Sequence, residues 1–146
     1  NNYQYDGAML YGYMGYGGSN KYANIFEAKA NQDGSENIKA VSFMTGRSTN
    51  LNYTVSIYTN LTDETNPESG TLAAQKSGIT TYDGTYTVNL DSPVEINEGN
   101  KFSVVVEVIS IILYNCCCPV DTATRYIEPC IPVVYKTFII PVNCTS

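Results

Sequence analysis

The sequence contains no histidine and no tryptophan. Without histidine, a cysteine or serine nucleophile has no imidazole to activate it, so papain-like and Ser-His-Asp catalysis are excluded within this chain. Histidine-bearing zinc sites are excluded for the same reason. Because tryptophan stacks most strongly on sugars, any aromatic sugar platform must be built from other rings.

Basic charge is also scarce. Eight Lys and Arg residues stand against fourteen Asp and Glu, the formal net charge is -6, and no run of basic residues occurs. Phosphate backbones and anionic membranes would be repelled, so we expect no nucleic-acid partner. The longest apolar stretch, residues 104–113, contains Glu107 and is too short to cross a bilayer, so we expect no membrane insertion.

Cysteine is missing from the first 115 residues, and all five cysteines follow. A disulfide scaffold would spread its cysteines through the fold, so the body must fold by core packing. Adjacent cysteines point to opposite faces of a strand, which disfavours metal ligation. We expect buried thiols or one or two disulfides, with an odd thiol left over unless chains pair. The disulfide candidates are Cys116, Cys117, Cys118, Cys130 and Cys144.

The chain is rich in Thr, Ser, Asn, Tyr and Gly, and 43% of its residues are hydrophobic. This composition is typical of pleated, half-exposed strands and is sufficient for one core. Short apolar-polar alternations recur with polar connections between them, and no longer window has a helical period. The strand candidates are residues 23–30, 38–45, 53–59, 71–77, 85–90 and 101–108. We therefore predict one all-β domain over 1–146, an antiparallel β-sandwich of jelly-roll type.

The alternation also predicts which side chains are buried and where the chain turns. Residues 31–37 and 81–84 are expected to form turns, and residues 60–70 a long exposed loop. Residues 92–100 form a separate segment with Pro93 at its start and a turn at its end. The predicted core-facing residues are Phe26, Ala28, Tyr53, Val55, Ile57, Tyr86, Val88, Leu90, Phe102, Val104, Val106 and Val108.

Residues 3–18, YQYDGAMLYGYMGYGG, are unusually rich in tyrosine and glycine. Tyr3 and Tyr5 are expected to begin the first strand. The later tyrosines either pack against the sheet or stack on a sugar ring, with asparagine amides bonding the hydroxyls. The sugar-binding candidates are Tyr11, Tyr13, Tyr16 and Tyr58, with Asn20, Asn24 and Asn60 as polar partners.

Carboxylates are concentrated in two predicted loops. Two facing carboxyls, drawn from Asp63, Glu64, Glu68 and Glu27, would be needed for glycoside hydrolysis. Calcium is a better use of such groups, because it takes six to eight oxygen ligands. Plain solvated loops are the competing interpretation. The calcium candidates are Asp63, Glu64, Glu68, Asp33 and Glu36.

An ordered series of segments resembles a known family. The segments are YQYDG (3–7), MGYGG (14–18), YANIFEAK (22–29), ENIKAVSFMT (36–45), YTVSIYTNLTDETNPESGTLAA (53–74) and LDSPVEINEGNKFSVVVEV (90–108). Together they resemble the lectin-like domain that follows the papain-like catalytic domain in secreted and cell-surface cysteine peptidases of clostridia and related Gram-positive bacteria. Residues 1–108 form the family-like body, whereas residues 109–146 are an atypical cysteine-rich segment that we expect to supply the last strands.

The resemblance implies a jelly-roll sandwich, a secreted or cell-wall location, calcium in some members and no catalysis by the domain itself. We expect an accessory domain that positions the catalytic domain by contacting that domain, cell-wall glycan or a surface protein. The alternatives are a free-standing adhesin or filament subunit, and a glycan-active enzyme.

Overall fold

The computed structural model describes residue 3 and residues 19–29, 34–45 and 50–109, and these residues form strands and loops with no helix. The strands are β1 (Ser19–Glu27), β2 (Ser35–Thr45), β3 (Asn52–Thr59), β4 (Thr71–Ile79), β5 (Gly84–Asn97) and β6 (Lys101–Ile109). In this part of the chain, therefore, no helix is available to span a membrane. The all-β prediction is confirmed.

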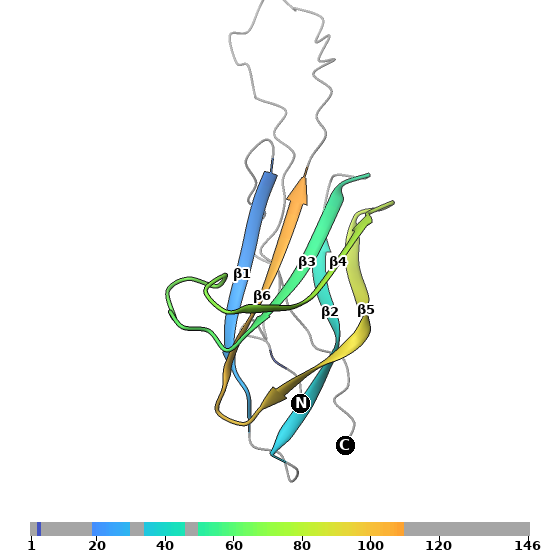
Figure 1. The fold of residues 1–146 in the computed structure, drawn as a ribbon. Helices are drawn as coiled ribbons and strands as arrows, with labels where there is room; N and C mark the ends of the chain where they lie inside the picture. Colours follow the sequence, from blue (N-terminus) through green and yellow to red (C-terminus); the bar gives the residue numbers. More distant parts are fainter. Residues whose placement is uncertain (1–2, 4–18, 30–33, 46–49, 110–146) are drawn as a thin grey trace, which may run out of the picture.

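The strands form two antiparallel sheets packed face to face (Figure 1). One sheet has the order β1-β6-β3-β4, and the other contains β2 and β5. All four strand pairings are antiparallel. The predicted antiparallel β-sandwich is therefore confirmed.

The core lies between the two sheets and contains the side chains that strand alternation selects. Val55, Ile57, Val104 and Val106 are each at most 1% exposed. Phe26, Val88 and Phe102 are also buried, as predicted, and Tyr53, Tyr86 and Leu90 pack at the margin of the core. Burial of this apolar surface is the main stabilising contribution to the fold, at about 25 cal/mol per Å².

β6 departs from simple alternation, because Ser103 and Val105 are buried as well as the core-facing residues. Ser103 is covered by the β3–β4 loop, residues 60–70, which crosses the outer face of β6 and β1 (Figure 1). Ser103 Oγ donates a hydrogen bond to the carbonyl oxygen of Pro67. We call this loop the strap. The sequence correctly predicts it as a loop but not its position across the sheet.

β5 also differs from the prediction. The sequence suggests that a strand ends near residue 90 and a separate segment follows, whereas the structure has one strand that runs through Pro93. Ile38 pairs with Val94 and Ala40 with Asn89, so the register shifts at this point. Proline lacks the N–H that a regular ladder needs, which explains why it lies at the irregularity. β2 begins at Ser35, inside the predicted 31–37 turn.

Candidate functional site

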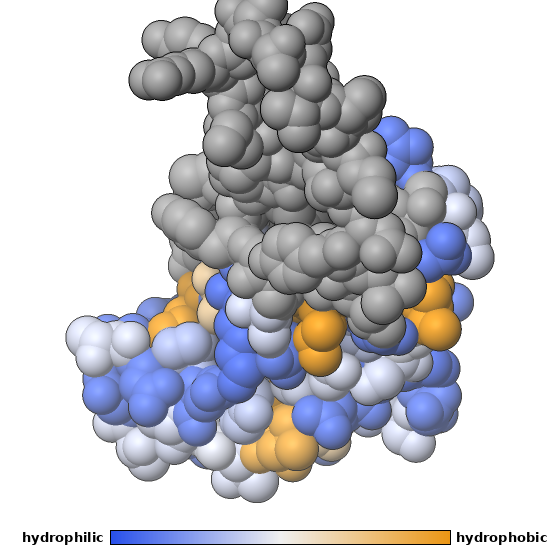
Figure 2. Space-filling model, turned by 90° about the horizontal axis from the view of Figure 1, so that it is seen from above, coloured by the Kyte–Doolittle hydropathy of each residue, from blue (hydrophilic) through white to orange (hydrophobic). Residues whose placement is uncertain are grey.

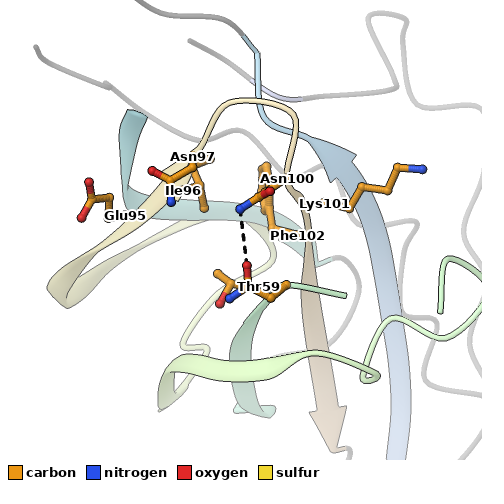
Figure 3. A pocket seen from close by; sticks show the side chains of 8 residues that line it. Thr59, Glu95, Ile96, Asn97, Asn100, Lys101 and Phe102 are labelled. Atoms are coloured by element: carbon orange, nitrogen blue, oxygen red, sulfur yellow. Dashed lines mark hydrogen bonds between the residues drawn. The ribbon is translucent and has the colours of Figure 1, made fainter. Parts of the chain in front are cut away.

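A polar pocket lies at the end of the sandwich where β3 and β5 end and β6 begins (Figure 3). Its volume is about 60 Å³. This is the space of a hydroxyl or hydroxymethyl group rather than of a whole sugar ring, since one water occupies about 30 Å³ in the liquid. The lining residues are Thr59, Asn60, Glu95, Ile96, Asn97, Asn100, Lys101 and Phe102.

The floor of this pocket is apolar and rigid. Ile96 and Phe102 are 3% and 1% exposed. The Phe102 ring packs edge-to-face on Tyr3, with 5.1 Å between centroids, and lies 5.5 Å from the Phe26 ring. Because these rings fill the core beneath the pocket, the polar residues of the rim stand on a fixed base.

Asparagine amides form the rim, and we call Asn60, Asn97 and Asn100 the amide rim. Asn100 Nδ2 lies 3.4 Å from Asn60 Oδ1, and the Asn100 backbone N–H donates to the carbonyl oxygen of Asn97 at 3.0 Å. Asn60 has a φ of 54°, a left-handed conformation that asparagine tolerates better than most residues. Each carboxamide can both donate and accept, which suits the hydroxyl groups of a neutral ligand.

The charged residues of the pocket point outward. Lys101 extends away from the amides, and Glu95 points away on the other side (Figure 3). The Lys101 ammonium forms an ion pair with Glu64 of the strap. With its cation neutralised and directed elsewhere, the pocket is better suited to uncharged hydroxyls than to phosphate or sulfate.

The structure separates the predicted sugar-binding residues that it describes. Tyr58 pairs with Ser103, on the outer face of the four-stranded sheet beneath the strap. Asn20 and Asn24 pair with core-facing valines of β6, so they lie on the opposite face of that sheet. Asn60 lies in the pocket. Tyr11, Tyr13 and Tyr16 lie outside the described residues.

The strap carboxylates each have a different partner. Asp63 Oδ1 accepts hydrogen bonds from the N–H and the hydroxyl of Thr65, at 2.8 and 2.7 Å. These bonds lower the pKa of Asp63. Glu68 Oε1 lies 2.7 Å from Lys21 Nζ, and this hydrogen bond and the charge of Glu68 raise the pKa of Lys21.

Glu36, the other described calcium candidate, is buried in the core. It is 3% exposed and accepts a hydrogen bond from the Tyr3 hydroxyl, which itself accepts from the backbone N–H of Lys29 at 2.7 Å. The Tyr3 side chain therefore lies in the core, and Tyr3 is not part of a strand. The prediction that Tyr3 begins the first strand is wrong.

The described calcium candidates thus have separate partners. Among the residues that the structure describes, no three acidic or sulfur side chains gather closely enough to hold a metal ion. Asp33 and the five candidate cysteines, Cys116, Cys117, Cys118, Cys130 and Cys144, lie outside those residues. Glu27, considered for glycoside hydrolysis, is exposed and pairs in register with Lys101.

Sequence reasoning missed most of the amide rim. Asn97 and Asn100 belong to NEGN, which the sequence identifies as a turn, and Gly99 takes φ of 77° there. The turn was predictable, because asparagine and glycine favour such conformations. The meeting of this turn with the end of β3 was not, since it depends on the β3–β6 pairing.

Comparison with protein families gives one match. A family model described as a lectin-like domain matches residues 2–126, which is most of the 146-residue chain. The match continues past Val108 into the cysteine-rich segment. A comparison with curated proteins finds no matching sequence.

Proposed function

Because the chain belongs to the lectin-like domain family, we propose that it is a non-catalytic domain that binds a hydroxyl-rich ligand on a cell surface. Family membership supports a carbohydrate- or surface-binding role. The amide rim is the observation that carries the proposal, because three neutral donor-acceptor groups surround one small pocket. The ligand would insert a hydroxyl or hydroxymethyl group between Asn97 and Asn100, above Phe102.

The resemblance to domains of clostridial cysteine peptidases supplies the finer part of this proposal. In that setting the domain would lie beside a papain-like catalytic domain of the same secreted or wall-bound protein. By holding cell-wall glycan, the catalytic domain or a surface protein, it would fix where the peptidase acts. Ligand binding would raise the local concentration of substrate without any chemistry in this domain.

The lack of catalysis is part of the proposal. The chain has no histidine, and the described carboxylates considered for acid-base work are held by different partners. Incubation of the domain with wall polysaccharide should release no new reducing ends, whereas a glycosidase would release them steadily.

A second candidate is a free-standing adhesin or filament subunit. It is favoured by the position of β4 at the end of its sheet, where Leu72 and Ile79 are 47% and 58% exposed. Such an edge can accept a strand from another molecule. Light scattering with and without reductant tests this candidate: concentration-dependent assembly would support it, and a strict monomer in both conditions would exclude it.

Sedimentation with isolated Gram-positive cell walls tests the binding proposal. Wild-type protein should sediment with the walls. A variant combining Asn97→Ala and Asn100→Ala should bind about thirtyfold more weakly, because each of the two lost hydrogen bonds contributes about 1 kcal/mol. Asn89→Ala, at an exposed position on β5 away from the pocket, is the matched control. Equal sedimentation of all three proteins would contradict the role of the amide rim.

A further inference from the structure

The β4–β5 loop carries an exposed tyrosine ring at the end of the sandwich opposite the pocket. Tyr82 is 55% exposed, and its ring stacks on Tyr86 with 4.7 Å between centroids and an interplanar angle of 21°. A stacked, nearly parallel pair covers one face of the outer ring. The exposed area of Tyr82 is therefore available at its other face and edges.

The backbone beneath this ring is fixed by one hydroxyl group. Tyr86 OH accepts hydrogen bonds from the N–H groups of Thr81 and Tyr82, both at 2.8 Å, and donates to the carbonyl oxygen of Tyr82 at 2.8 Å. A tyrosine hydroxyl has one donor and two acceptor sites, so its capacity is used completely. The loop is consequently held at the residue that carries the exposed ring.

The stack continues into the core. The Tyr86 ring lies 5.8 Å from Phe43 at an angle of 20°, and Phe43 contacts Tyr53 edge-to-face at 5.1 Å. Phe43 is 1% exposed. The series Tyr82, Tyr86 and Phe43 thus runs from solvent to the buried interior, and the outer ring requires little further ordering when a ligand arrives.

The surroundings of Tyr82 favour a sugar over an apolar partner. Its neighbours Thr81, Asp83 and Thr85 are exposed and offer hydroxyl and carboxylate oxygens. Figure 2, which views the molecule from above Figure 1, shows hydrophobic residues separated by hydrophilic ones over the coloured surface. A pyranose combines a C–H face that stacks on a ring with hydroxyls at its edge, which matches one ring bordered by oxygen acceptors.

We propose that Tyr82 is a stacking platform for a pyranose ring, and that it forms a second sugar-contact site distinct from the amide rim. This inference rests on the proposed function, because it assumes that the ligand is a glycan. Asp83 and the net charge of -6 favour a neutral or amino sugar over an acidic one.

The test uses an array of neutral hexose and N-acetylhexosamine oligosaccharides, with wild-type protein and variants at Tyr82. Tyr82→Ala should weaken binding roughly tenfold, whereas Tyr82→Phe should bind like wild type because stacking needs the ring and not the hydroxyl. Leu72→Ala, which removes an exposed apolar side chain from β4, is the control. Melting temperatures establish that each variant is folded.

The outcomes separate the two proposals. If wild type binds glycans and Tyr82→Ala binds them equally well, the platform is excluded while the proposed function stands. If wild type binds but Tyr82→Phe loses affinity as severely as Tyr82→Ala, stacking is contradicted. If the folded wild type binds none of the oligosaccharides, the platform and the glycan-binding function are both contradicted.

Discussion

The two ends of the sandwich present different chemistry. At one end, the amide rim surrounds a small pocket above the buried side chains of Ile96 and Phe102. At the other end, Tyr82 offers a ring face supported by Tyr86. Both features lie on turns and stand on core aromatic residues. The comparison shows how one rigid core can support both a small polar pocket and an exposed tyrosine ring.

The largest expected effect comes from Phe102, which supports the pocket end. Replacing it with alanine should lower the free energy of unfolding by about 3–5 kcal/mol, since a fully buried ring leaves a cavity beneath Tyr3 and Phe26. Chemical denaturation measures this change. Leu72→Ala, at an exposed site on β4, should change it by less than about 0.5 kcal/mol. Similar losses in the two variants would contradict the assigned core.

The opposite end is tested by Tyr86→Phe. Removing the hydroxyl breaks three hydrogen bonds to the β4–β5 loop and leaves the ring in place. The free energy of unfolding should therefore fall by about 1–3 kcal/mol. Sugar stacking at Tyr82 should weaken, while the effect of the amide rim on binding should stay unchanged. A variant that loses both binding contributions equally would show that the two ends do not act independently.

The strap should contribute less. Glu68→Gln removes the partly exposed ion pair with Lys21 and should cost about 0–1 kcal/mol, measured as faster proteolysis within residues 60–70. Asp91→Asn breaks the Lys76–Asp91 pair outside the strap and is the matched control. Equal cleavage of the strap in wild type and Glu68→Gln would show that the ion pair does not hold it.

The same strap gives a pH prediction with a defined sign. The pKa of Asp63 is lowered by Thr65, so its contribution is complete above about pH 3.9 and is lost as pH falls through the lowered pKa. The pKa of Lys21 is raised by Glu68, so its contribution is complete below about pH 10.4 and is lost as pH rises further. The contribution of these two groups to the stability of the strap should therefore be constant between about pH 5 and 9. Strap proteolysis measures that contribution.

Calcium should have the smallest effect at the strap, since binding there would require Glu64 and Glu68 to leave Lys101 and Lys21. Glu68→Gln should therefore leave any response of the melting temperature to calcium unchanged. The contradicting result has three parts: calcium raises the melting temperature, EDTA reverses that rise, and Glu68→Gln abolishes it. In that case the strap is a calcium site despite the pairing described above.

The sequence predicts the sandwich well because strand alternation depends on nearby residues. Val55, Ile57, Val104 and Val106 occupy the core as expected. Ser103 lies on the other face of β6, where alternation places it, but the strap covers it. Such coverage depends on the path of a loop across a sheet, which local periodicity does not describe.

The candidate sites are less predictable than the fold. The sequence identifies Asn60 as a polar candidate, but the neighbours of Asn60 come from a turn about forty residues further along the chain, and only strand pairing brings them together. Tyr82 was part of a predicted turn, and its importance depends on the stack formed with Tyr86. Residue types in turns predict turn geometry, whereas convergence across strands requires the fold.

The most direct test of the account is an equilibrium titration of the folded domain with purified Gram-positive wall polysaccharide. Saturable binding to wild type is predicted, with weaker binding for the variant combining Asn97→Ala and Asn100→Ala and for Tyr82→Ala, and little change for Asn89→Ala. The absence of saturable binding by the folded wild-type domain would contradict the claim that it recognises a hydroxyl-rich surface glycan.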